Sequence, residues 1–129
     1  MIKTKSIYHD PIGLEDGYRL LVMRRWPRGV RKTRVDGWLK ELGPSSALLG
    51  KLREDKIDWQ TFSHLYKEQV GGTEAGRALL EEVECLERAH GVVTLLCHED
   101  LARPDTNCHR VLLKELLDTK VHHSPHAPS

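Results

Sequence analysis

A thiol and a carboxylate lie two residues apart near the C-terminal end of the sequence, at Cys97 and Glu99. They follow an apolar stretch of strand length, residues 92–96, and alternate side chains of an extended chain point to the same side. A thiol in such a place can act as a nucleophile, and a carboxylate can act as a general base or orient a partner histidine. We therefore predict Cys97 and Glu99 as catalytic residues.

A second group of reactive side chains, Cys108, His109 and Arg110, occupies the predicted first turn of the last helix. The unpaired N–H groups and the dipole of a helix N-terminus favour thiolates and bound anions. His109 can exchange a proton near neutral pH, and Arg110 can hold a phosphate or carboxylate through two parallel hydrogen bonds. We predict Cys108 and His109 as catalytic and Arg110 as ligand-binding. The alternative is that Cys108 is an inert core thiol and that its two neighbours are solvated.

Metal and phosphate motifs give weaker signals. Cys97, Cys108 and His109 are zinc-ligand types, but they lack the paired Cys-x-x-Cys spacing of strong zinc motifs, so the sequence assigns no metal. Cys97 and Arg103 match the Cys-x5-Arg loop of cysteine phosphatases; we interpret this match as coincidence, because Pro104 delays the following helix. The Gly-x-Gly-x-x-Gly and Walker motifs are absent, and no cofactor is assigned.

The segment 18–34 carries seven cationic side chains, one tryptophan and no acidic residue. Such a segment can bind phosphates through its cations and stack a base on its ring. We predict that Arg24, Trp26 and Arg28 bind the ligand, and that the later cations are solvated. The alternative is that the arginines pair with the acidic residues of segment 74–90 while the tryptophan seals the core.

The elements that position these residues follow from the hydrophobic periodicity and the turn residues. Strands are predicted at residues 2–8, 18–23 and 92–96. Helices are predicted at residues 36–42, 45–53, 59–70, 74–90 and from about 107 to 117. This order predicts a small, three-layer-like α/β domain with a short, mostly parallel sheet flanked by helices. Ligands bind outside the carboxyl ends of such strands, where two of the reactive segments begin.

Length and composition describe one water-facing domain. The 129 residues are 39% hydrophobic and 30% charged, with a formal net charge of +1, which excludes a globally polybasic or polyacidic protein. We assign residues 1–120 to a single domain and residues 121–129, which contain three histidines and two prolines, to a disordered tail. No apolar stretch suits a membrane span or a signal peptide, and three irregularly spaced cysteines suit reduced thiols, so we expect a cytoplasmic protein.

Several motifs of the chain together resemble one family. They are Asp16-Gly17-Tyr18-Arg19-Leu20-Leu21-Val22, Arg24, Trp26-Pro27-Arg28-Gly29, Trp38-Leu39-Lys40-Glu41-Leu42, Pro44-Ser45, Phe62, Tyr66, Val93-Thr94-Leu95-Leu96-Cys97 and Cys108-His109-Arg110. Over residues 2–117 the chain resembles the domain of unknown function 488 (DUF488) family, in its short YeaO-like branch. The resemblance implies a compact α/β domain and assigns no reaction. It also implies an aspartate at the position of Met23, so this chain lacks a carboxylate beside the predicted site.

Two hypotheses follow from the sequence. The first is a domain that binds a small anionic, for example nucleotide-like, molecule at the carboxyl ends of the strands, with the Cys-x-Glu and Cys-His-Arg elements as its site. The alternative is a non-enzymatic module that binds nucleic acid or protein through residues 19–34. The sequence leaves open whether the protein is an enzyme and what its oligomeric state is.

Overall fold

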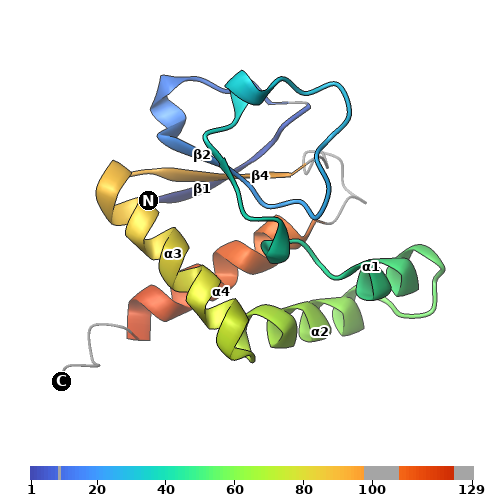
Figure 1. The fold of residues 1–129 in the computed structure, drawn as a ribbon. Coiled ribbons are helices and arrows are strands. Elements are labelled where there is room, and N and C mark those ends of the chain that lie inside the picture. The colour runs from blue at the N-terminus through green and yellow to red at the C-terminus, as the bar shows by residue number, and fades with distance from the viewer. Residues whose placement is uncertain (9, 98–107, 124–129) are drawn as a thin grey trace.

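The computed structural model describes residues 1–8, 10–97 and 108–123. Four strands of this part of the chain form one sheet in the order β1-β4-β2-β3, and all neighbouring strands are parallel (Figure 1). The strands are β1 (Ile2–Ser6), β2 (Tyr18–Leu21), β3 (Gly37–Trp38) and β4 (Val93–Cys97). The predicted small α/β domain with a mostly parallel sheet is confirmed.

Within the described ranges, four α-helices accompany the sheet: α1 (Ser46–Arg53), α2 (Trp59–Gly71), α3 (Glu74–His90) and α4 (His109–His123). The first three begin as predicted, because the side chains of Ser45, Asp58 and Thr73 each accept a hydrogen bond from a backbone N–H of the first turn. Helix α4 continues to residue 123, three residues beyond the boundary that we drew at 120. No helix in the described part of the chain is long and apolar enough to cross a bilayer.

The α-helices pack against one face of the sheet (Figure 1). Strand residues such as Leu20 and Leu95 point into this main core, whereas their neighbours Leu21 and Leu96 point into a smaller core on the opposite face. Loops and 3-10 turns between β1 and β3 cover that second face. All residues of β4 are buried, because this inner strand is covered on both sides.

The predicted helix at residues 36–42 is wrong. Asp36, which we expected to cap that helix, accepts hydrogen bonds from the backbone N–H and the guanidinium of Arg19. The chain then runs extended as β3, and the N–H of Leu39 donates to the carbonyl of Leu21. Only a 3-10 turn, η3 (Lys40–Leu42), remains helical. A tertiary ion pair and strand pairing therefore replace the local cap.

Candidate functional site

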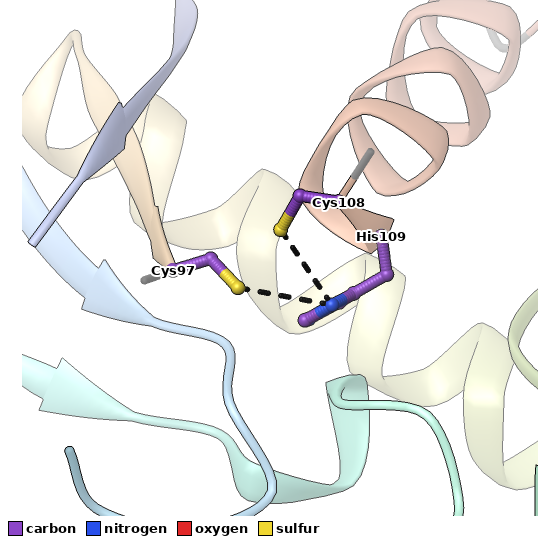
Figure 2. A group of neighbouring side chains, drawn as sticks. All are labelled: Cys97, Cys108 and His109. Atoms are coloured by element: carbon purple, nitrogen blue, oxygen red, sulfur yellow. Dashed lines mark hydrogen bonds between the residues drawn. The ribbon is translucent and has the colours of Figure 1, made fainter. Parts of the chain in front are cut away.

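Three of the predicted site residues meet where β4 ends and α4 begins (Figure 2). Cys97 is the last residue of β4, Cys108 directly precedes α4, and His109 is the first residue of that helix. Their exposed fractions are 1%, 3% and 8%. These three side chains lie together at the carboxyl end of β4, where the sequence predicts reactive residues. We call them the Cys-Cys-His cluster.

The imidazole of His109 stands at the centre of the Cys-Cys-His cluster. The sulfur atoms of Cys97 and Cys108 each lie 3.8 Å from its Nδ1. Its Nε2 lies 2.6 Å from the carbonyl oxygen of Val22, the residue that follows β2. A carbonyl oxygen only accepts, so Nε2 carries the hydrogen, and in the neutral ring the lone pair of Nδ1 faces the two sulfurs. The end of β2 thus selects the tautomer that the thiols meet.

Tyr66 of α2 supports this imidazole from the core side. The two rings are in edge contact, with centroids 5.5 Å apart and planes inclined by 61°. The hydroxyl of Tyr66 donates a hydrogen bond of 2.5 Å to the carbonyl of Leu42, so its position is set by η3. Burial, and after it the nearby Cys108 and Cys97, raises the pKa of Tyr66 well above its ordinary value. The phenol therefore remains a neutral donor that holds the histidine ring in place.

A cavity of about 480 Å³ opens beside the Cys-Cys-His cluster, with Cys97 and His109 in its lining. Three arginines also line it: Arg24 and Arg25 after β2, and Arg53 in the last turn of α1. The remaining lining residues are Met23, Pro44, Ser46, Leu49, Gly50 and Leu52. The cavity thus joins a thiol and an imidazole to a cationic and partly apolar wall.

The arginines of the cavity differ in how they are held. Arg24 is half-buried, and its guanidinium donates to the carbonyls of Gly43 and Pro44, which ties the end of β2 to the start of α1. Arg25 and Arg53 are exposed. Sequence reasoning missed Arg53, because a basic residue in the last turn of a helix is ordinary and only the fold brings α1 beside β2.

Arg110 differs from these three arginines because its side chain is almost fully buried. Its side chain is 1% exposed, and its Nε and Nη1 have no hydrogen-bond partner among the described residues. No described carboxylate forms an ion pair with it, although a buried charge is normally paired. Arg110 does not line the cavity, yet it follows His109 directly in the first turn of α4. An anion near this helix end would satisfy the guanidinium.

The structure places the other predicted ligand-binding residues away from the cavity. Trp26 packs against the smaller core and donates from its indole nitrogen to the carbonyl of Val30. The side chain of Arg28 is exposed and does not line the cavity. Glu99 and Arg103 lie outside the described residues. Of the basic segment, Arg24 and the unpredicted Arg25 therefore reach the cavity.

The arrangement supports two kinds of chemistry. A thiol of the Cys-Cys-His cluster can pass its proton to Nδ1 of His109, which yields a thiolate beside an imidazolium. Alternatively, two thiolates and the Nδ1 lone pair are ligands that soft metal ions prefer. Both uses depend on the hydrogen bond that Val22 accepts, because that bond leaves Nδ1 unprotonated in the neutral ring.

A family model and several known proteins are similar in sequence to this chain. A family model described as the active DUF488-N3 subclade matches residues 2–121. The uncharacterized protein YeaO of Escherichia coli (strain K12) is 43% identical over 67 residues, which are 50% of this chain and 57% of YeaO. The uncharacterized proteins Rv3073c of Mycobacterium tuberculosis (strain ATCC 25618 / H37Rv) and Mb3100c of Mycobacterium bovis (strain ATCC BAA-935 / AF2122/97) are 29% identical over 119 residues, which are 91% of this chain and 93% of each relative. No solved structure matches. The chain therefore belongs to the DUF488 family, as its motifs implied.

Proposed function

We propose that the protein binds a small anionic molecule in the cavity at the carboxyl ends of β2 and β4. The observation that carries this proposal is the lining itself, which combines three arginines with Cys97 and His109 around about 480 Å³. Volumes of this size are typical of pockets for small molecules. The site lies where ligands of parallel α/β sheets usually bind.

The charge of the lining favours an anion. It contains Arg24, Arg25 and Arg53 and no acidic residue among the described side chains. A concave wall of one sign concentrates ligands of the opposite sign, and guanidinium groups match the geometry of phosphates and carboxylates. The buried cation of Arg110, at the same end of α4, adds to the positive field.

The apolar part of the lining indicates the shape of the ligand. Leu49 and Leu52 of α1 and Met23 after β2 border the cavity together with the arginines. A nucleotide-like molecule has both an anionic group and a flat, weakly polar body, and it would use both kinds of wall. Met23 stands where the family resemblance implies an aspartate, so this wall is less acidic here than the family pattern predicts.

Cys97 supplies the reactive group in this proposal. Its thiol gives its proton to Nδ1 of His109, and the imidazolium keeps its Nε2 hydrogen on the carbonyl of Val22. The resulting thiolate lies at the cavity wall, where it faces a bound molecule. Whether the thiolate attacks that molecule depends on the ligand's own chemistry.

Calorimetric titration tests the anion site. The probes are inorganic phosphate, pyrophosphate and adenosine monophosphate, each added to wild-type protein and to the variants Arg25→Gln and Arg53→Gln. A hydrogen bond to a charged group contributes about 1.5–3 kcal/mol, so each variant should weaken binding by about tenfold or more. Arg31→Gln is the matched control, because Arg31 is exposed and lies outside the lining. Equal affinities in all variants, or no binding of any probe, would overturn the proposal.

The nucleic-acid alternative is less favoured by the placement of Trp26. Its ring packs against the smaller core, and Arg19 is engaged with Asp36, which removes a stacking ring and one cation from the predicted surface. The same titration with a single-stranded oligonucleotide separates the two functions. Loss of oligonucleotide binding in Arg28→Gln, with phosphate binding intact, would support the alternative.

A further inference from the structure

We propose that Cys97, Cys108 and His109 bind one zinc ion. This inference stands on the geometry of the Cys-Cys-His cluster and does not depend on the anion site. The sequence argued against a metal, because the cysteines are separated by ten residues rather than by two. This separation along the sequence does not keep the side chains apart, because the end of β4 and the start of α4 lie next to each other.

The three donor atoms already lie at distances that suit one ion. Each sulfur is 3.8 Å from Nδ1, and all three atoms lie within 4.8 Å of one another. With bonds of about 2.3 Å to sulfur and about 2.05 Å to nitrogen, a tetrahedral zinc ion separates sulfur from nitrogen by about 3.6 Å and sulfur from sulfur by about 3.8 Å. To close the site, each sulfur–nitrogen distance would shorten by about 0.2 Å and the sulfur–sulfur distance by at most about 1 Å.

The histidine is oriented in the way that metal-binding histidines require. Its Nε2 hydrogen is donated to the carbonyl of Val22, so Nδ1 is free of a proton in the neutral ring and points toward both sulfurs. Ligating histidines usually donate their other ring hydrogen to a carbonyl or carboxylate, which fixes the ring and raises its basicity. The Tyr66 ring holds the same imidazole from the side.

Charge and burial also agree with zinc. Cys97 and Cys108 bind as thiolates after releasing their protons to solvent, so a divalent ion forms a locally neutral group with them and with neutral His109. A neutral group suits side chains that are 1% to 8% exposed. No electron is transferred, so no oxidant or reductant is needed. The soft sulfur donors select zinc over calcium or magnesium.

The cavity gives the ion an open side. Cys97 and His109 line it, so a water molecule or an anionic group in the cavity could complete the coordination. Three protein ligands and one open position are typical of catalytic rather than structural zinc sites. This last step, in which the anion reaches the ion, rests on the proposed function, whereas the three-ligand site does not.

Cobalt substitution tests the site. Full-length protein without an affinity tag is stripped with a chelator and titrated with Co²⁺. We expect thiolate-to-cobalt charge-transfer bands and strong visible bands of tetrahedral cobalt, which saturate at one equivalent and disappear when zinc is added. Cys97→Ser, Cys108→Ser and His109→Asn should each weaken binding by about tenfold or more. Controls that should keep the spectrum are Cys85→Ser and the triple variant His122→Ala/His123→Ala/His126→Ala.

X-ray absorption of the zinc-loaded wild-type protein keeps the test independent of variants that fail to fold. The expected coordination contains two sulfurs and one imidazole nitrogen. Coordination by oxygen and nitrogen alone, or cobalt bands that vanish only in the triple histidine variant, would overturn the zinc site. The two proposals fail separately, because Arg25→Gln and Arg53→Gln should weaken phosphate binding and leave the cobalt bands unchanged.

Discussion

Replacing Asp16 with asparagine should destabilise the fold measurably, because this carboxylate is fully buried between cations. Asp16 ends the 3-10 turn η1 (Leu14–Asp16) and has no exposed surface. Its oxygens accept hydrogen bonds from the ammonium groups of Lys3 and Lys5 on β1 and from the N–H of Gly13. The carboxylate thus fastens the η1 turn to the first strand of the sheet.

The pKa of Asp16 gives the size of this effect. Burial alone raises that pKa, but the hydrogen bonds from Lys5, Gly13 and Lys3 and the charge of Lys5 outweigh it and lower the pKa from 3.8 to about 2. At about 1.36 kcal/mol per pKa unit, the ionised form contributes roughly 2 kcal/mol to the free energy of unfolding. A folded-state pKa below the unfolded value means that this stability is complete above pH 3.8 and is lost as the pH falls through about 2.

Urea unfolding of wild-type protein and Asp16→Asn measures the difference directly. At pH 7 the variant should lose roughly 2 kcal/mol, and near pH 3 the gap should shrink to about half, since the unfolded carboxyl is then mostly protonated. Glu15→Gln is the matched control, because the Glu15 side chain is exposed on the same turn and should change stability by less than about 0.5 kcal/mol. A loss no larger than that of the control, or a gap that stays constant between pH 5 and pH 2.5, would refute the reasoning.

Three further substitutions test the packing around the site by thermal or urea unfolding. Tyr66→Phe removes the donor to a buried carbonyl and should cost roughly 1–2 kcal/mol; an unchanged midpoint would mean that water replaces the hydroxyl. Gly17→Ala should destabilise by more than about 1 kcal/mol, because its φ of 61° disfavours alanine and the new Cβ would collide with the Val92 carbonyl, and a neutral result would require the turn to move. Leu113→Ala should cost roughly 2–5 kcal/mol, whereas Val111→Ala on the exposed side of the same helix should be nearly neutral; similar losses would contradict the assigned helix face.

The elements that local chemistry controls were predictable from the sequence. Ser45, Asp58 and Thr73 cap their helices because each is a short polar residue before an apolar periodic segment. The strand before Cys97 was predictable because an apolar run after a glycine-terminated helix is typical of a buried parallel strand. The position of Cys97 at the carboxyl end of the sheet followed from this strand prediction.

The features that tertiary contacts decide were not predictable in the same way. Asp36 has the side chain of a helix cap, but its ion pair with Arg19 draws the chain into β3. Arg53 reaches the cavity only because α1 packs beside the end of β2. The wide spacing of Cys97 and Cys108 along the chain argued against a metal site. Spacing along the chain does not show the distance in space, and the fold brings the end of a strand and the start of a helix together.

The two proposed uses of the Cys-Cys-His cluster compete for one atom. Nδ1 of His109 either accepts a proton from a thiol or donates its lone pair to zinc, and Val22 holds Nε2 in the same bond in both cases. In a zinc-loaded chain, His109 would therefore not be available as a general base. Any reaction would then take place at the open coordination position of the ion. A metal-free chain would use the Cys97 thiolate instead. Under the two proposals, the arginines of the cavity bind the anion in either state, and the metal content of the protein, rather than its anion affinity, would decide which chemistry the cluster performs.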